Sequence, residues 1–163
     1  MGDLAYWPSA KPLSLKDKFA KNRDYIENLN HVDQIWENLK FKCGDTLAVC
    51  DLRGKYKEKF SYSELADLIT QVSFSFKNYG LVKGDVVTLI SENSPRWLIA
   101  DQGLMRLGAI NAVRGINSPS VEMEYIIEHS NSVGLIVQSK ETWLKLKNKE
   151  ELKKRLKFII NLE

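Results

Sequence analysis

The chain has 163 residues, of which 44% are hydrophobic and 28% charged, and hydrophobic residues occur along its whole length. This composition excludes a disordered or low-complexity chain, and the length suits one ordinary hydrophobic core rather than a multi-domain enzyme. The formal net charge of +3 is small for a dedicated nucleic-acid-binding protein, so we predict no nucleic-acid partner.

Hydrophobic periodicity divides the chain into helices and strands. Three- and four-residue spacing predicts amphipathic helices, and short apolar runs predict buried strands. The sequence first predicts a helical stretch over 16–40, which one break near residue 30 could divide, a strand over 46–50 and a polar turn or hairpin tip over 51–59. Four helices follow, over 62–79, 95–107, 122–129 and 141–156. Each of these helices is followed by a strand, over 86–90, 109–113, 134–137 and 158–160 respectively.

The alternation of strands and helices from Thr46 onward predicts an α/β fold. Five strands separated by helices favour a doubly wound, mostly parallel sheet with flanking helices. The run 86–90 is apolar on both faces, so we place it in the middle of that sheet. We therefore divide the chain into a helical N-terminal arm, residues 1–40, and an α/β part, residues 41–163.

Two cysteines, Cys43 and Cys50, are too few and too widely spaced for a disulfide framework or a CxxC metal site. Cys50 ends an apolar run, so we predict a small buried side chain, with a reactive thiol as the alternative. Neither a signal peptide nor a run of about 20 apolar residues is visible. These features favour a reducing, cytoplasmic compartment.

A basic segment lies near the C-terminal end of the chain. Between Lys140 and Lys157 there are eight basic and three acidic residues. This pattern is typical of the solvated face of an amphipathic helix. The alternative is a patch that attracts anionic lipid or a phosphorylated partner, so peripheral membrane contact stays open.

A search for chemistry finds no catalytic, cofactor-binding or metal-binding residue. No GxGxxG or GxxxxGKS/T arrangement is present, and His31 and His129 lie far apart, outside any metal motif. His129 lies at the C-terminal end of the predicted helix over 122–129, where its cation suits the helix dipole. Ligands of doubly wound sheets bind beyond the carboxyl ends of strands, so the rim candidates are Asn93, Arg114 and Asn117. The structural alternatives are turn and helix-cap formation by the rim after 86–90, with Ser94 as the N-cap and Pro95 in the first turn of the next helix, and pairing with a carboxylate for Arg114.

The order and spacing of four segments resemble the opening of the adenylate-forming, AMP-binding enzymes. These segments are Phe60–Leu65, Gly80–Val87, Ser91–Trp97 and Asp101–Ala109. Residues Ala112–Gly115 look like the long-chain fatty-acid acyl-CoA synthetase branch, and the resemblance is closest to the acyl-ACP synthetases of cyanobacteria and plastids. The resemblance runs from about Val32 to the end of the chain.

This resemblance implies a ligase that uses ATP and Mg to convert a fatty acid to an acyl-adenylate, and then to a thioester with CoA or acyl carrier protein. In the family, the phosphate loop, the adenine-binding segment and the catalytic lysine come later in the chain. We therefore expect an N-terminal fragment, truncated at its C-terminus, that is inactive by itself, binds no cofactor and self-associates through exposed apolar surface or an open strand edge. The alternative is a free-standing flavodoxin-like module that binds a nucleotide or a protein without catalysis.

Overall fold

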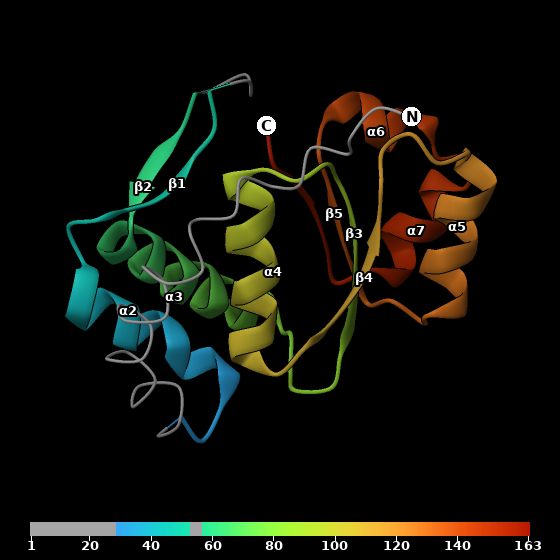
Figure 1. The fold of residues 1–163 in the computed structure, drawn as a ribbon. Coiled ribbons are helices and arrows are strands. Elements are labelled where there is room, and N and C mark those ends of the chain that lie inside the picture. The colour runs from blue at the N-terminus through green and yellow to red at the C-terminus, as the bar shows by residue number, and fades with distance from the viewer. Residues whose placement is uncertain (1–28, 53–56) are drawn as a thin grey trace, which may run out of the picture.

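A computed structural model describes residues 29–52 and 57–163 (Figure 1). Residues 53–56 of the predicted turn or hairpin tip over 51–59, and residues 1–28 of the predicted arm over 1–40, lie outside these residues. The described elements are η2 (Val32–Gln34), α2 (Ile35–Cys43), β1 (Leu47–Cys50), β2 (Lys59–Ser61), α3 (Tyr62–Asn78), β3 (Val86–Ile90), α4 (Pro95–Leu107), β4 (Ile110–Arg114), α5 (Ser120–His129), β5 (Gly134–Val137), α6 (Lys140–Lys145), α7 (Lys149–Arg155) and β6 (Phe158–Asn161).

The main sheet has four parallel strands in the order β4-β3-β5-β6. Helices α3 and α4 cover one face, and α5 and α7 cover the other (Figure 1). This arrangement confirms the predicted doubly wound α/β fold. Strand β3 pairs with a strand on each side, and its last four residues are buried, as its uninterrupted apolar run predicted.

The prediction that residues 46–50 join the parallel sheet is wrong. Strand β1 instead pairs antiparallel with β2 in a separate two-stranded sheet. The short strand around Phe60 follows β1 closely in the chain and offers a local hairpin partner, whereas a parallel pairing needs a long crossover. Because the hairpin stands apart from the main sheet, Cys50 is exposed, and the prediction that it is buried is also wrong.

The predicted helix over 141–156 is two short helices, α6 and α7. Leu146 caps α6 in an extended conformation (ψ 139°), and its side chain is fully buried between α5 and the sheet. The N–H of Lys147 donates to the Glu124 carboxylate on α5. Burial of Leu146 and this bond stabilise the break, which local spacing does not reveal.

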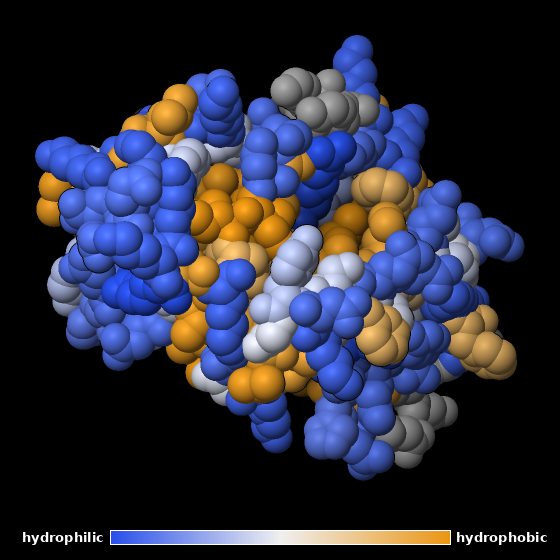
Figure 2. Space-filling model, turned by 180° about the vertical axis from the view of Figure 1, so that it is seen from behind, coloured by the Kyte–Doolittle hydropathy of each residue, from blue (hydrophilic) through white to orange (hydrophobic). Residues whose placement is uncertain are grey.

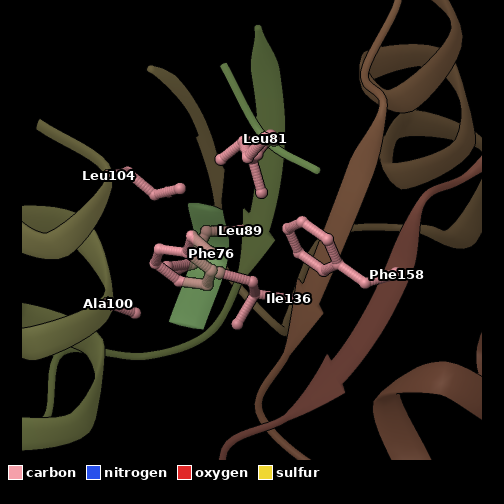
Figure 3. Close-up of a cluster of buried hydrophobic side chains, with 8 residues drawn as sticks. Phe76, Leu81, Leu89, Ala100, Leu104, Ile136 and Phe158 are labelled. Atoms are coloured by element: carbon pink, nitrogen blue, oxygen red, sulfur yellow. The ribbon is translucent and has the colours of Figure 1, made fainter. Parts of the chain in front are cut away.

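Buried side chains form one cluster on each face of the sheet. Phe76 from α3, Leu104 from α4, Leu89 from β3 and Phe158 from β6 meet on one face (Figure 3), where the rings of Phe76 and Phe158 stack with centroids 5.7 Å apart. On the other face, Leu135 of β5 belongs to a cluster with residues of α5 and α7. Each fully buried Leu, Ile or Phe stabilises the fold by about 1.5–3 kcal/mol.

A third cluster attaches the hairpin to the body of the protein. Leu65 and Ile69 of α3 pack with Ile99 of α4, and the half-buried Val49 and Phe60 of the hairpin lie against them. At the start of α3, Ser61 and Glu64 form a capping box, in which the Ser61 N–H donates to the Glu64 carboxylate at 2.8 Å. This bond lowers the pKa of Glu64, because it favours the charged form.

Candidate functional site

A cleft of about 850 Å³ lies between the β1–β2 hairpin and the carboxyl ends of β3, β5 and β6. Its wall contains the residues that follow these strands, namely Ser91–Ser94 after β3, Gln138 after β5 and Leu162–Glu163 after β6, together with the first residues of α4. The hairpin contributes Val49–Asp51 and Lys57–Glu58 to the opposite wall. The cleft therefore stands where doubly wound sheets bind their ligands.

Strand order places the topological switch point of the sheet at this cleft. The chain runs from β3 outward to β4 on one side, returns to β5 on the other side of β3, and continues outward to β6. The segments that leave β3 and β5 therefore diverge, and a crevice opens between them at their carboxyl ends. Both segments line the cleft.

The side chain of Gln138 bridges this crevice. Its Oε1 accepts a hydrogen bond from the N–H of Glu92 at 2.9 Å and a longer one from the hydroxyl of Ser91 at 3.5 Å. Its Nε2 donates to the Glu163 carboxylate at 3.4 Å. One amide thus joins the segments that follow β3, β5 and β6, and holds the rim of the cleft together.

Helix α4 begins at the wall of the cleft. As predicted, Ser94 is its N-cap and Pro95 its first residue. The Ser94 hydroxyl accepts from the N–H of Trp97 at 3.1 Å, which satisfies one of the free N–H groups of the first turn. The prediction that the rim after β3 serves as a helix cap is therefore confirmed for Ser94.

Arg96 connects the two walls of the cleft. Its Nε donates to Glu58 of the hairpin side at 2.7 Å, and its guanidinium also donates to the carbonyl of Leu162 after β6. The arginine and glutamate side chains are 33% and 19% exposed, so solvent screens this ion pair less than a surface pair. The contacts of Arg96 hold the hairpin against the end of the sheet.

The three rim candidates are only partly brought together. Asn93 lines the cleft, whereas Arg114 and Asn117 are not among the residues of its wall. Arg114 forms an ion pair with Glu122 at 2.6 Å, which confirms the structural alternative of a carboxylate partner. Asn117 donates to Glu92 across 3.4 Å. A direct role of these three residues in ligand contact stays a prediction.

Sequence reasoning missed Gln138 and Arg96. Gln138 follows a buried strand directly, and the rule that selected the rim candidates could have found it. The role of Arg96 depends on a hairpin whose position the local pattern does not reveal. Along the part of the chain that the structure describes, no cluster of three or more potential metal ligands occurs.

The basic segment is extensively paired within the protein. Lys153 and Lys154 bind Glu150 and Glu151 on the same helix, and Lys157 binds Asp85 at 2.6 Å. Lys145 and Lys149 donate to backbone carbonyls. Of the described helices, none is long and apolar enough to cross a membrane.

Residues 36–162 match the family described as AMP-binding enzyme. The chain belongs to this family. It is 35% identical over 131 residues to a probable acyl-activating enzyme 16 and 33% identical to a long-chain-fatty-acid–acyl-carrier-protein ligase, both chloroplastic proteins of Arabidopsis thaliana. A crotonobetaine/carnitine–CoA ligase of Escherichia fergusonii is 28% identical over 110 residues. The family resemblance is thereby confirmed at the level of adenylate-forming ligases, whereas the cyanobacterial likeness stays a prediction.

Solved structures confirm the fold. The N-terminal subdomain of NpsA from Klebsiella oxytoca, in complex with 3-hydroxyanthranilyl-AMSN, superposes with a TM-score of 0.69 at 22% identity, over 85% of this chain and 32% of that chain. The anthranilate CoA ligase AuaEII, in complex with anthranoyl-AMP, gives 0.71 at 21% identity, over 80% and 24%. The chain spans 18% of the length of the two Arabidopsis relatives.

Proposed function

We propose that this chain supplies one α/β segment of an ATP-dependent ligase that joins a long-chain fatty acid to the thiol of CoA or acyl carrier protein. The observation that carries the proposal is the match over 131 residues to a relative named for long-chain fatty acids and acyl carrier protein. In the proposed reaction, the fatty carboxylate attacks the α-phosphate of ATP and releases pyrophosphate. The thiol then displaces AMP, which is a far better leaving group than oxide.

The cleft does not fit the triphosphate of ATP. Among the described residues of its wall there are four carboxylates, Asp51, Glu58, Glu92 and Glu163, against two cations, Lys57 and Arg96, so these residues together repel an anionic ligand. The described part of the wall also contains no glycine, and phosphate-cradling loops depend on glycine to bring several N–H groups to one point. We therefore assign no step at the phosphorus atom to this cleft, and ATP and Mg belong to other parts of the proposed ligase.

We therefore expect the chain alone to be inactive. The sequence contains no GxxxxGKS/T loop, and the charge of the cleft opposes nucleotide binding. We expect no fatty-acid-dependent pyrophosphate release from the isolated chain with palmitate and ATP. Turnover by the isolated chain would overturn this part of the proposal.

The substrate class is tested on the product of the whole reading frame. We expect the transcript to encode, downstream of this segment, a Ser/Thr/Gly-rich loop that ends in lysine, and its product to release pyrophosphate with palmitate. Anthranilate and carnitine are the matched controls, because structural and sequence relatives are named for these acids. Faster release with either control than with palmitate would refute the fatty-acid assignment, and a transcript without the loop would refute the ligase assignment.

One observation favours the alternative of a free-standing binding module, since the cleft stands at the switch point of the sheet. Calorimetry separates the two proposals. The ligase-segment proposal predicts no heat of binding from ATP or a fatty-acyl-adenylate analogue added to the isolated chain. Saturable binding of either compound would favour the module.

Cytoplasmic location completes the proposal, and peripheral membrane contact is its alternative. Lys153, Lys154 and Lys157 already pair with Glu150, Glu151 and Asp85. We therefore expect no more retention on anionic vesicles than on neutral ones. Salt-sensitive retention on phosphatidylserine vesicles alone would instead show membrane contact.

A further inference from the structure

The first described part of the chain lies against the body of the protein without being buried in it. Helix α2 and the β1–β2 hairpin lie beside α3 (Figure 1), and no described residue from 29 to 64 is buried. Helices α3 and α4 bury five residues each. On the face opposite to the view of Figure 1, hydrophobic residues gather in the middle of the molecule rather than at its sides (Figure 2). We call α2 and the hairpin, residues 35–52 and 57–61, the outer layer.

The apolar contacts of the outer layer are only partial. Trp36 of α2 and Val49 and Phe60 of the hairpin pack on the third hydrophobic cluster, but all three remain half-buried. Phe41 on α2 and Leu47 on β1 are exposed. Apolar stabilisation scales with the area that is removed from water. The outer layer therefore gains less from the core, residue for residue, than α3 and α4 do.

Polar contacts with α3 and α4 complete the attachment of α2. The indole N–H of Trp36 donates to Gln102 Oε1 at 2.8 Å. The Glu37 carboxylate accepts from the Thr70 hydroxyl at 3.4 Å and lies 3.3 Å from the Arg106 guanidinium. The side chain of Glu37 is 50% exposed, so solvent screens this ion pair and its contribution is small. These contacts can break at little cost.

A short connection joins α2 to the hairpin. Residues 44–46 separate the end of α2 from the start of β1. The carbonyl of Gly44 accepts from the N–H of Ser63, and the carbonyl of Thr46 accepts from the N–H of Tyr62, both at 3.0 Å. The connection is thus fixed to the first residues of α3. A movement of α2 about this point therefore carries the hairpin with it.

We propose that the outer layer opens and closes as one unit about the start of α3, and that the ion pair between Arg96 and Glu58 holds it closed over the cleft. The hairpin forms one wall of the cleft, so opening of the layer widens the cleft. The capping box of Ser61 and Glu64 keeps the start of α3 in place. This inference does not depend on the ligase activity, because it rests on the burial and the contacts of this chain.

Native-state hydrogen exchange of the whole chain, followed by mass spectrometry, tests whether the outer layer opens by itself. In the wild type, we expect the amides of α2 and of the β1–β2 hairpin to show the same protection, at least about tenfold below that of β3. Equal protection of the outer layer and β3 would overturn the proposal, because the layer would then open only when the whole fold unfolds.

Glu37→Ala tests the coupling inside the outer layer. It removes the contacts of Glu37 with α3 and α4 and introduces a good helix former. Exchange should rise about threefold in the hairpin as well as in α2, because both elements share one opening. Glu150→Ala is the matched control, since it breaks an exposed ion pair on α7, and it should not change exchange in the outer layer. Faster exchange confined to α2, or no change in either element, would refute the coupling.

Arg96→Met tests the same coupling from the side of the cleft. It removes the ion pair with Glu58, so exchange should rise in α2 by about the same factor as in the hairpin. Acceleration confined to the hairpin would contradict the proposal. Far-ultraviolet circular dichroism checks that the three variants are folded, and the wild-type pattern of protection decides the matter if one of them is not.

Discussion

The close approach of Gly134 and Phe158 provides a sharp test of the packing between β5 and β6. A Cβ atom added at Gly134 would lie 2.5 Å from Cζ of Phe158, with two further ring atoms within 2.9 Å. The ring has little room to withdraw. It is 7% exposed and lies between Phe76, with centroids 5.7 Å apart, and Tyr79, with centroids 5.6 Å apart. Gly134→Ala therefore forces the ring and its neighbours to move.

We expect Gly134→Ala to lower the free energy of unfolding by about 2 kcal/mol, which is the usual range for overpacking a filled core. Phe158→Leu, which shortens the side chain, should alone cost about 1–2 kcal/mol through lost contacts. In the double variant the clash is relieved, so its total loss should fall below the sum of the single losses by about 1–2 kcal/mol. Urea unfolding followed by circular dichroism measures all three values.

Gly115→Ala is the matched control, because a Cβ at Gly115 meets nothing within 4 Å. It should change the free energy of unfolding by less than about 0.5 kcal/mol. Two results would refute the reasoning. One is a Gly134→Ala variant as stable as Gly115→Ala, and the other is strict additivity in the double variant.

Three further perturbations test polar contacts. The Lys157 hydrogen bond lowers the pKa of Asp85, so the Asp85 carboxylate stabilises the folded state at neutral pH, and this contribution is lost as the pH falls below about 4. In Asp85→Asn, the free energy of unfolding should therefore fall less steeply between neutral and acidic pH. An unchanged pH dependence would contradict the assignment. The indole N–H of Trp97 is buried without an acceptor. Trp97→Phe should therefore lower the free energy of unfolding by less than the roughly 3–5 kcal/mol typical of deleting a buried aromatic side chain. A loss of that size in urea unfolding would show that the N–H has a hydrogen-bond partner. Arg96→Met should leave the Glu58 carboxylate without its 2.7 Å partner. Amide hydrogen exchange should then become faster in the β1–β2 hairpin, by a larger factor than in β3. Equal acceleration in both would show that Arg96 supports the whole fold.

Local pattern was sufficient to predict the elements of the main sheet. The uninterrupted apolar run over 86–90 correctly identified the central strand, because a strand covered by helices on both faces has no polar face to display. Ser94 and Pro95 correctly marked the start of α4, since a cap depends on residues within one turn. The order of segments likewise indicated the family, although the sequence has no GxGxxG or GxxxxGKS/T arrangement.

Tertiary structure decided the features that depend on distant neighbours. The partner of β1 is β2 rather than the parallel sheet, and this choice exposes Cys50 and makes the hairpin one wall of the cleft. Gln138 reaches the crevice because β5 returns to the side of β3, a consequence of strand order. Sequence periodicity determines which segments become strands and which faces are apolar, because these depend on nearby residues. Pairing depends on which apolar surfaces far apart in the chain bury each other best, so the cleft and the edges of the sheet emerge only in the folded molecule.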